Sequence, residues 1–407
     1  MTELLWFTFG LSIAITVYHI AVYPLILEWA AGRYGRKSVP ASPPADWPGI
    51  TILIPAYNEE KIIARKIENL GQIDYPRDKI HIQLALDGCA DQTQAFATAA
   101  AARERSGLDI QIVAYPRNIG KVAILNSQIG AITTPLVALS DASAFFAPNA
   151  IKQAVAHFSD PKVGVVFPTY ALNEPGSTGE QTYIRYLTHV KALETRLDSA
   201  IGGHGALYLF RRPLWQPLPP DTINDDYILP LRIVAAGYRG IYDPDIVAVE
   251  MEKTHSVQEF RRRMRLSAGN MQQTIELIKL ADPRRFWLAF MFVSGKGLRP
   301  FIPLLAAVAV IAADLLALRY SVLAWVLLTA GMVAVGVLAL RVRQLRGLPG
   351  VVLKAGYALE GLAASLIGSV KYLLGFKAGQ WQRSKEDQLD RVAAATVYQS
   401  PKTSVLT

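Results

Sequence analysis

The hydrophobic pattern divides the chain into an apolar start, a long middle of short alternating elements, and an apolar end. Leu4 to Leu27 is almost uninterrupted apolar sequence, about the length that crosses a bilayer as one helix. No Lys or Arg precedes it, whereas Arg33, Arg36 and Lys37 follow, and such a basic flank faces the cytoplasm. A cleaved signal peptide would have a basic start and a shorter apolar core. The pattern therefore predicts a retained transmembrane anchor over residues 1–32.

A stiff, proline-rich linker, Pro40 to Pro48, separates this anchor from the middle of the chain. From residue 49 to 257, short runs rich in β-branched residues alternate with segments of helical spacing. This alternation predicts an α/β fold with a mostly parallel sheet covered on both faces. The expected strands are Ile50 to Ile54 (ended by Pro55), Ile80 to Leu86, Ile110 to Ala114 and Leu136 to Leu139, and the expected helices are Glu59 to Leu70, Ala95 to Arg105 and Lys121 to Gly130.

The end of the chain returns to apolar sequence. Residues 258–296 are predicted to form amphipathic interfacial helices, because Val257 to Lys279 is basic and amphipathic and Arg284 to Lys296 is aromatic with basic ends. Residues 297–378 form the predicted C-terminal transmembrane region, with spans at Leu298 to Leu318 and Ser321 to Leu340.

The last apolar segment, Val351 to Phe376, is interrupted by Lys354, Glu360 and Lys371. Ionisable groups at membrane depth usually face protein or water. A fourth full span would place the tail, residues 379–407, outside, whereas its basic residues favour the inside. The side of the tail stays open at this point.

Composition supports a water-soluble domain attached to membrane helices. The 407 residues are 51% hydrophobic, yet they include 42 Lys and Arg against 33 Asp and Glu, for a net charge of +9. A soluble enzyme is seldom so apolar, and the predicted spans are too few to enclose a transport path. The basic balance suits an anionic membrane surface or a phosphate-bearing substrate, and no nucleic-acid partner is expected. Cys89 is the single cysteine, which excludes a disulfide or a cysteine-based zinc site.

Acidic residues follow apolar runs at three places in the middle of the chain. They are Asp87, Asp141 and the pair Asp225 and Asp226. In an open α/β sheet the ligand crevice lies at the carboxyl ends of the strands. Carboxylates there suit a bound cation, a ribose or a proton to be removed, so we expect them to surround one site.

The motif Pro-Ala-Tyr-Asn-Glu-Glu, residues 55–60, follows the first strand directly. An Asn and a Glu at this place can hydrogen-bond a base or a ribose, and a turn with acidic capping is the alternative. Together with Asp-Gly-Cys-Ala-Asp (87–91), Asp-Ala-Ser (141–143) and Asn-Asp-Asp (224–226), this order resembles the family 2 glycosyltransferases. These are inverting enzymes with a GT-A fold that use nucleotide sugars. The resemblance covers Gly49 to Gln273, and the membrane helices are placed as in the family's polysaccharide-making members.

The resemblance implies a nucleotide-sugar site made of Pro55, Tyr57, Asn58, Glu59, Asp87, Lys121 and Asp141. Asp87 matches the family aspartate that contacts the base, although a turn aspartate before a glycine would look the same. Asp91 is interpreted as a turn or helix cap. Lys121 closes a segment that resembles the family's Asn-x-Gly-Lys, and a solvated lysine that opens a helix is its alternative.

Asp141 also matches the first residue of the family's Asp-x-Asp element, which holds Mg²⁺ or Mn²⁺ on the diphosphate. Hard cations prefer carboxylate oxygens and leave positions for phosphate and water. Ser143 stands where the second carboxylate is expected. The resemblance therefore implies a divalent cation in a weakened site.

The glycine segment 202–206 resembles the family's acceptor-side loop, which assigns Gly203, His204 and Gly205 to the acceptor. His204 is otherwise an incidental loop histidine. In Asn-Asp-Asp the last acid is the family's catalytic base, which implies Asp226 as base with Asp225 as its neighbour. Adjacent carboxylates raise each other's pKa, which suits a base near neutral pH. Helix capping by these acids is the alternative.

Arg263 matches the arginine of the Gln-x-x-Arg-Trp motif of processive family members, but Phe260 and Met264 replace its Gln and Trp. An arginine here neutralises the leaving diphosphate or lies on anionic lipid. The two replacements count against polymerisation. They favour the alternative of a single sugar addition to a lipid acceptor, whereas Ser143 supports the alternative of a non-catalytic nucleotide-binding subunit of a synthase.

The leading hypothesis is a multi-pass enzyme of the cell's inner membrane with a cytoplasmic catalytic domain. It would transfer a sugar from a UDP-sugar to a glycan or lipid-linked acceptor, for an extracellular or envelope polysaccharide. Sequence alone does not indicate the sugar, the linkage or any partner subunits of a synthase.

Overall fold

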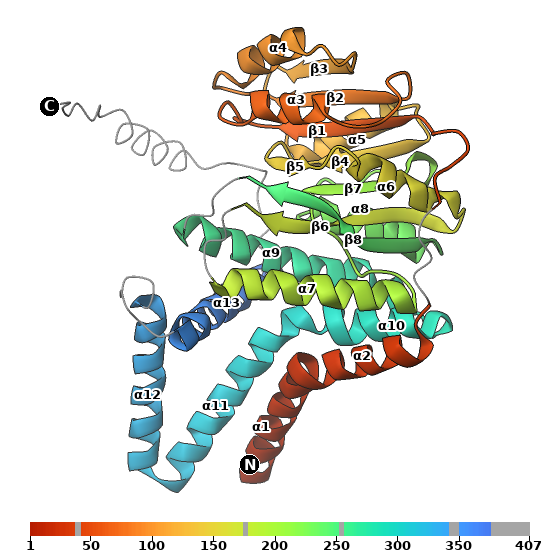
Figure 1. Ribbon diagram of the computed structural model, residues 1–407. Helices are drawn as coiled ribbons and strands as arrows, with labels where there is room; N and C mark the ends of the chain where they lie inside the picture. The colour runs from red at the N-terminus through yellow and green to blue at the C-terminus, as the bar shows by residue number, and fades with distance from the viewer. Residues whose placement is uncertain (37–41, 174–177, 252–255, 342–349, 376–407) are drawn as a thin grey trace, which may run out of the picture.

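The computed structural model describes residues 1–36, 42–173, 178–251, 256–341 and 350–375. The predicted tail 379–407 and the start of the linker at Pro40 lie outside these ranges. An α/β domain stands on a base of long helices, and α1 (Thr2–Val17), α11 (Ile302–Tyr320) and α12 (Val322–Arg341) extend away from it (Figure 1). The soluble domain and the apolar helices are therefore spatially distinct.

In the described part of the chain, the strands form one eight-stranded sheet with the order β3-β2-β1-β4-β7-β6-β8-β5. Neighbours among β1, β2, β3 and β4 pair in parallel, as do β6 and β8. β7 runs antiparallel to both β4 and β6, and β5 runs antiparallel to β8. The strands are β1 (Ile50–Ala56), β2 (Ile80–Asp87), β3 (Asp109–Tyr115), β4 (Leu136–Ser140), β5 (Ala144–Phe146), β6 (Val163–Leu172), β7 (Leu207–Arg211) and β8 (Arg239–Glu250). The predicted α/β class is confirmed, with antiparallel strands added in its second half.

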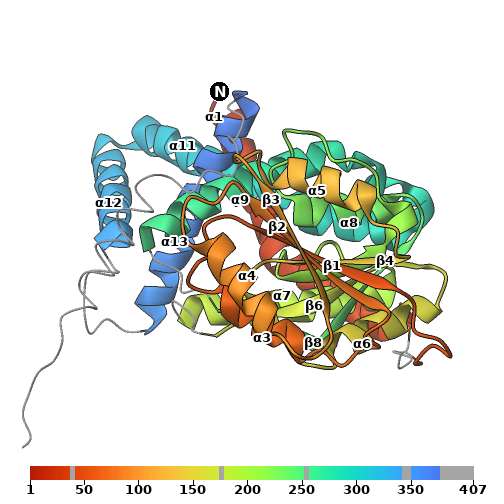
Figure 2. The ribbon, with the colours of Figure 1, turned by 90° about the horizontal axis from the view of Figure 1, so that it is seen from above.

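Helices cover both faces of the sheet, as the view from above shows (Figure 2). α3, α4 and α6 pack on one face, and α5 and α8 pack on the other. The alternation of side chains along β1 explains this, because Ile52 and Ile54 face the first layer and Leu53 faces the second. The helices of the domain are α3 (Ile63–Gly71), α4 (Thr93–Arg103), α5 (Lys121–Ala131), α6 (Ala150–Ala156), α7 (Thr178–Leu197) and α8 (Asp225–Ala235).

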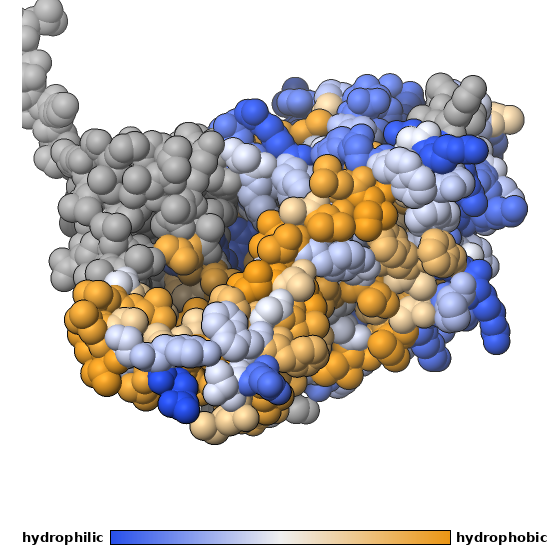
Figure 3. Space-filling model, turned by 90° about the horizontal axis from the view of Figure 1, so that it is seen from below, coloured by the Kyte–Doolittle hydropathy of each residue, from blue (hydrophilic) through white to orange (hydrophobic). Residues whose placement is uncertain are grey.

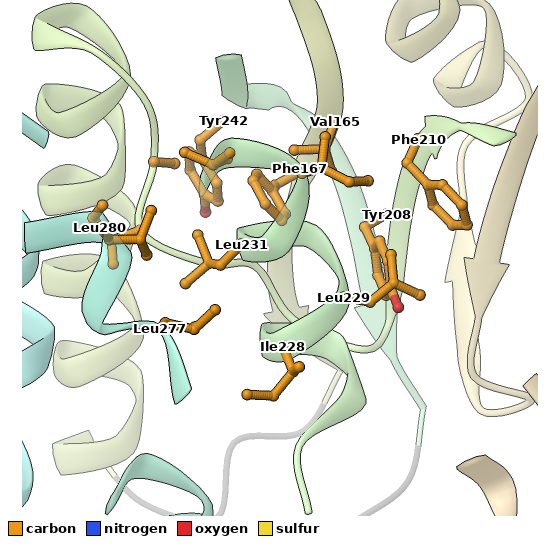
Figure 4. Packing of buried hydrophobic residues seen from close by; sticks show 14 of the residues in the cluster. Val165, Phe167, Tyr208, Phe210, Ile228, Leu229, Leu231, Tyr242, Leu277 and Leu280 are labelled. Atoms are coloured by element: carbon orange, nitrogen blue, oxygen red, sulfur yellow. The ribbon is translucent and has the colours of Figure 1, made fainter. Parts of the chain in front are cut away.

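The second face of the sheet shares its hydrophobic core with the helical base. Phe167 from β6, Tyr208 from β7 and Leu231 from α8 belong to one buried cluster with Leu277 and Leu280, which lie just before and within the short helix η4 (Ile278–Ala281) (Figure 4). This continuous core fixes the position of β6, β7 and α8 relative to the helical base.

The N-terminal helix joins the same core. After α1 and the π-helical turn η1 (Tyr18–Val22), α2 (Tyr23–Tyr34) packs against α7, and Leu27, Ala30 and Ala31 are fully buried. The Arg196 guanidinium donates to the Ala31 carbonyl at 2.9 Å. The helical stretch thus continues beyond the apolar run that ends at Leu27 as far as Tyr34, close to the predicted boundary at residue 32, and α2 packs on the α/β domain.

The C-terminal helices complete the base. It contains α9 (Ser256–Glu276), α10 (Phe286–Met291), the π-helical η6 (Phe292–Gly297) and α13 (Gly350–Leu373). α13 lies along α9, where Ser267 Oγ donates to the Ser365 carbonyl at 2.8 Å. A Cβ on Gly368 would come within 2.2 Å of the Met264 carbonyl oxygen, so the two helices touch through small residues. The charged last apolar segment is therefore a helix packed on α9.

Two described helical stretches, Thr2–Tyr34 and Pro283–Tyr320, are long and apolar enough to cross a membrane by length and composition. Of their most apolar windows only 17% and 28%, respectively, is buried inside the protein, which is unlike a core helix. Val322–Met332 is a shorter apolar stretch. The underside of the molecule is largely apolar (Figure 3).

Two element boundaries differ from the sequence prediction. β1 continues through Pro55 to Ala56, because it stays paired with β2 as far as Leu86, whereas its pairing with β4 ends at Leu53. α3 begins at Ile63 rather than Glu59. The backbone of Glu59 instead donates to Thr93 Oγ1 at 2.7 Å, which holds a turn at this place.

Candidate active site

Three segments meet at the carboxyl end of β4 because β7 runs antiparallel to it. Ser140, the last residue of β4, pairs with Leu207, the first residue of β7. The glycine loop before β7 therefore lies beside Asp141. A Cβ placed on Gly205 would lie 3.0 Å from Asp141 Oδ2 and 3.5 Å from Asp226 Oδ2. Both carboxylates face one small space, and a glycine leaves it open.

Asp226 reaches this space from the first turn of α8. Asn224 occupies the N-cap position but makes no capping hydrogen bond with its side chain. Its amide instead donates to the Leu266 carbonyl of α9 at 3.4 Å, which ties α8 to the base. Carboxylates in the first turn are favoured by the helix dipole. The local preference of a helix start for acids thus delivers Asp225 and Asp226 to the edge of the sheet.

Lys121 is the cation of the cluster. It opens α5, and its Nζ lies 3.2 Å from Asp141 Oδ1 and 3.2 Å from Asp225 Oδ2. The contact with Asp141 is also a hydrogen bond, whereas the contact with Asp225 is an ion pair without hydrogen-bond geometry. Burial alone would lower the pKa of Lys121, but the surrounding carboxylates of Asp141, Asp225 and Asp226 raise it above its ordinary value. Lys121 is therefore charged and held between two of the three acids.

Asp226 has the properties of a base. Its side chain lies deep among protein atoms but keeps part of its surface accessible. Burial, and then the neighbouring charge of Asp225, raise the pKa of Asp226 to about 6, while the charge of Lys121 opposes this rise. A carboxylate with this pKa is ionised at neutral pH and still accepts a proton readily.

Asp87 lies behind this cluster and is completely buried. Its Oδ1 accepts from the Ile119 backbone N–H at 2.7 Å, and its Oδ2 accepts from the Gly120 N–H at 3.0 Å. Gly88 has φ +61°, and a Cβ on it would lie 2.2 Å from the Arg117 carbonyl carbon. Asp87 and Gly88 thus hold the loop that places Lys121. In this arrangement the backbone of that loop occupies both carboxylate oxygens.

The segment from Pro55 to Glu60 interlocks with the segment that follows Asp87. Pro55, Asn58 and Glu59 are buried, and Tyr57 is partly exposed. Asn58 has φ +56° and its Oδ1 accepts from the Ala90 N–H at 2.9 Å. Asp91 accepts from the Thr93 backbone at 3.0 Å and from the Glu60 N–H at 3.3 Å, so it is a turn and helix-start residue, as interpreted from the sequence. The two loops form a single rim at the carboxyl end of β1 and β2.

The glycine loop is packed too tightly for side chains. A Cβ on Gly202, which has φ +95°, would lie 2.0 Å from the Tyr227 ring, and one on Gly203 would lie 2.2 Å from the Phe167 ring. His204 stacks on Tyr170 with 4.7 Å between ring centres. Burial, then the charges of Lys191, Arg262 and Lys296, lower the pKa of His204 well below its ordinary value. The imidazole is therefore neutral at pH 7.

The arginines of α9 point in different directions. A Cβ on Gly361 of α13 would lie 3.2 Å from Arg263 Nη1, which places Arg263 against α13. The charges of two other arginines act on the site: that of Arg265 on Asp226 and that of Arg262 on His204. Arg263 thus lies at the interface of α9 with α13, while Arg262 and Arg265 are near enough for their charges to act on His204 and Asp226, respectively.

A buried lysine lies beneath the Asp141 segment. Lys66 from α3 is fully buried, its Nζ donates to Ser140 Oγ at 2.8 Å and to the Ala144 carbonyl, and it lies 4.5 Å from the centre of the Phe146 ring. Burial lowers the pKa of Lys66 to about 7, against the opposing charge of Asp141. Lys66 thus fastens both ends of the segment that contains Asp141 and Ser143.

The described residues supply part of the ligand set for a divalent cation. They contain no group of three His, Cys, Asp or Glu arranged to bind a metal by themselves. Asp141 Oδ2 nevertheless faces the open space beside Gly205, and its other oxygen is bound by Lys121. Mg²⁺ and Mn²⁺ are commonly held by one or two carboxylates together with phosphate oxygens. Asp141 suits such a site if a diphosphate supplies the remaining ligands.

Some residues of the cluster were not found from the sequence. Tyr208 of β7 places a buried hydroxyl, without a hydrogen-bond partner in the described residues, where the charges of all three acids act on it. Asn118 Nδ2, in the Asn-x-Gly-Lys segment identified from the sequence, is also a buried donor without an acceptor in the described residues. Lys191 and Lys296 lie beneath the glycine loop. Lys296 could have been identified from the sequence as a functional candidate, because it lies in an apolar run and ionisable groups in such runs are seldom incidental.

Comparisons with known proteins agree with this geometry. A protein from Mesorhizobium japonicum named N-acetylglucosaminyltransferase is 24% identical over 377 residues, which cover 86% of this chain and 84% of that protein. A β-monoglucosyldiacylglycerol synthase from Nostoc sp. is 25% identical over 300 residues, which cover 67% of this chain and 60% of that protein.

Among solved structures, the mannosyltransferase PcManGT from Pyrobaculum calidifontis, in complex with GDP-Man and Mn²⁺, superposes with a TM-score of 0.69. It is 25% identical, and the alignment covers 93% of this chain and 100% of that chain. The fold is therefore of the GT-A type that the sequence predicted, and the enzyme class is that of a glycosyltransferase. The model named Glycosyltransferase like family 2 matches residues 48–269, more than half of the chain, and the chain belongs to this family.

Proposed function

We propose that this glycosyltransferase is an inverting enzyme embedded in the inner membrane. It transfers a sugar from a UDP-sugar to a hydroxyl of a glycan or lipid-linked acceptor at the cytoplasmic face, for an extracellular or envelope polysaccharide. The observation that supports this best is the shared space beside Gly205, which Asp141 and Asp226 both face. One carboxylate is bound to a lysine there and the other keeps an elevated pKa, so the two acids suit different tasks.

Asp226 takes the proton of the acceptor hydroxyl as the hydroxyl oxygen attacks the anomeric carbon from the face opposite the leaving group. Lys121 and Arg265 add positive charge where the diphosphate departs, and fixed charges in a partly dry site act without reorganisation. Asp141 would hold a divalent cation, whose chemistry is to neutralise the diphosphate. Arg263 remains a predicted contact of the leaving group, which would require it to move from its place beside Gly361.

The helical base supports the membrane location. α11 leads away from the domain and α12 returns towards it (Figure 1). With α1 as a further crossing, and with α13 packed along α9, the described helices fit an odd number of crossings. This arrangement would leave the chain after α13 on the cytoplasmic side, where its basic residues favour it.

A second candidate is a single sugar addition to a lipid. It is supported by Phe260 and Met264, which replace the motif residues of processive members, and by the similarity to a diacylglycerol-modifying synthase. A non-catalytic subunit is the weaker reading, since a protein that only binds nucleotide needs no base at Asp226.

The test is a donor screen on membranes that contain the full chain. UDP-glucose, UDP-N-acetylglucosamine and GDP-mannose are supplied with Mg²⁺ or Mn²⁺, and released nucleoside diphosphate is counted while the labelled product is sized. We expect turnover with a UDP-sugar, and the length of the product separates polymerisation from single addition. Absence of turnover with every donor would remove the proposal.

A further inference from the structure

Two lysines lie buried beneath the glycine loop, on the side of Asp226 that faces the helical base. Lys191 comes from α7 and is 5% exposed, and Lys296 comes from η6 and is 8% exposed. Lys191 Nζ donates to the Gly203 carbonyl at 3.3 Å. Lys296 Nζ donates to Asn270 Oδ1 at 2.8 Å and lies 3.3 Å from the centre of the Tyr227 ring. Two elements that are far apart in the chain thus place two ammonium groups near each other, since the charge of Lys191 acts on Lys296.

Neither ammonium has an acidic partner among the described residues. In the described part of the chain, no ion pair joins Lys191 or Lys296 to a carboxylate. Glu194, the nearby acid on α7, accepts from the Ile201 N–H at 2.8 Å and from the Tyr23 hydroxyl at 3.5 Å. Burial raises the pKa of Glu194 to about 7, so it carries only part of a charge at neutral pH. Two buried cations of one sign are costly unless an anion joins them.

Lys191 and Lys296 lie between the proposed membrane side of the molecule and the catalytic base Asp226. Lys296 belongs to the apolar stretch Pro283–Tyr320. Gly203 is two residues from Gly205, which borders Asp226, and the charge of Asp226 acts on both lysines. From below, the apolar face is hollowed, and hydrophilic atoms line the floor of the hollow (Figure 3). A molecule that reaches this side of Asp226 would meet these lysines close to the catalytic base.

We propose that Lys191 and Lys296 bind the phosphate of the acceptor, and that the acceptor is a lipid with both a phosphate and a free hydroxyl. An ammonium is a point charge that recognises phosphate without a fixed geometry. This inference rests on the proposed function. In the transfer, the hydroxyl oxygen bonds to the anomeric carbon, and the bond from that carbon to the nucleoside diphosphate breaks. The electron pair leaves on the diphosphate, and the hydroxyl proton goes to Asp226.

The donor and the acceptor would then bring negative charge to opposite sides of Asp226. The donor diphosphate has Lys121 and a cation on Asp141, whereas the acceptor phosphate has Lys191 and Lys296. A neutral acceptor such as diacylglycerol would leave the two lysines without a counter-charge, which is why we choose the phosphate-bearing class.

The experiment measures lipid binding to the full chain, purified in an uncharged detergent and without any nucleotide sugar. The probes are dioleoylphosphatidylglycerol, dioleoylglycerol and inorganic phosphate. The variants are K191M and K296M, and K279M is the matched control because Lys279 is an exposed lysine of η4 in the same helical base. We expect phosphatidylglycerol to bind at least about tenfold more weakly to K191M and to K296M, and within about twofold of the wild type to K279M.

Three results would overturn the inference: unchanged phosphatidylglycerol affinity in both variants, dioleoylglycerol binding as tight as phosphatidylglycerol, or displacement by inorganic phosphate at equal concentration. The last result would assign the site to free phosphate. K191Q and K296Q are the second pair should a methionine variant fail to fold, and thermal unfolding verifies each protein. A chain that binds phosphatidylglycerol through these lysines but turns over no nucleotide sugar would contradict the proposed function and not this site.

Discussion

The buried lysines on the two sides of Asp226 differ in their partners and in the direction of their pKa shifts. On one side, Lys121 lies 3.2 Å from each of two carboxylates, and its pKa is raised. On the other side, Lys191 has a backbone carbonyl as its hydrogen-bond partner, and burial lowers its pKa to about 8 despite the charges of Glu194 and Asp226. Both side chains are largely enclosed. The difference is a direct ion pair with a carboxylate, which the described residues give to Lys121 and do not give to Lys191.

This contrast separates two kinds of buried cation. A paired lysine stabilises the apoprotein and organises its acids, whereas an unpaired one is a cost that a ligand offsets. We assign the first kind to the donor side and the second to the acceptor side. Removing the charge of Lys121 should therefore lower the free energy of unfolding, whereas removing the charge of Lys191 should raise it.

Loss of the base should have the largest effect. We expect D226N to lower the transfer rate by about 10²–10⁴-fold, since an amide accepts no proton, while donor affinity stays within about twofold. Released nucleoside diphosphate gives the rate, and calorimetric titration with the donor gives the affinity. Transfer at the wild-type rate in this variant would remove Asp226 as the base.

The comparison itself is tested by the stability of K121M and K191M. K121M leaves Asp141 and Asp225 without their cation and should lower the free energy of unfolding by about 3–5 kcal/mol. K191M removes an unpaired buried charge and should raise that free energy by on the order of 1–3 kcal/mol at neutral pH. Thermal unfolding of the purified proteins measures both.

The control for this pair is K152M, because the ion pair of Lys152 with Asp74 is exposed and should contribute less than about 1 kcal/mol. Since the folded pKa of Lys191 lies below its ordinary value, the unfolded chain binds more protons between pH 8 and pH 10.5. Wild-type stability should rise with pH in this window relative to K191M. Equal destabilisation by K121M and K191M would contradict the distinction.

On the donor side, D141A should weaken metal-dependent donor binding by roughly 10–100-fold. The physical reason is the loss of the carboxylate that faces the open space beside Gly205. Donor titrations with Mn²⁺ and with a chelator measure this, and S143D is a useful counterpart that restores the second acid of the motif. A donor affinity that is the same with metal and with chelator, in wild type and variant, would argue against a metal at Asp141.

The smallest effect concerns pH. Because burial and Asp225 raise the pKa of Asp226 to about 6, and because the base must be ionised, the transfer rate should fall about tenfold per pH unit below that value. D225N removes the neighbouring charge and should move the acid limb of the rate profile to lower pH by up to roughly one unit. An acid limb that stays in place would mean that another group controls it.

Much of the architecture was predictable from local sequence. The period of the apolar residues identified the strands β1 to β4 within two residues at their ends, and the helices α4 and α5, because these patterns depend only on which face a residue presents. The placement of Asp87, Asp141 and Asp226 after apolar runs indicated a common edge. The later start of α3, at Ile63, was not predicted. The backbone N–H groups of Glu59 and Glu60 bind Thr93 and Asp91, and these contacts take the place of a first helical turn.

The roles within the site were less accessible. Asp87 proved to be bound by the backbone of the Lys121 loop, and Arg263 lies beside α13 while Arg262 and Arg265 face the cluster. These directions depend on how α9 is rotated and on the path of one loop. Neither is set by the residue types themselves, so a motif locates such residues only approximately.

The sequence by itself determined the family, the α/β class and the acids that surround the site. The spacing of apolar residues and the order of the motifs can be recognised without knowing which distant residues are in contact. The tertiary structure decided that β7 runs against β4, which places Gly205 between Asp141 and Asp226. It also decided that Lys121 is paired with carboxylates, whereas Lys191 and Lys296 form no ion pair within the described part of the chain. The physical reason is that charge compensation is a property of neighbours in space, and those neighbours come from helices and strands that are far apart along the chain.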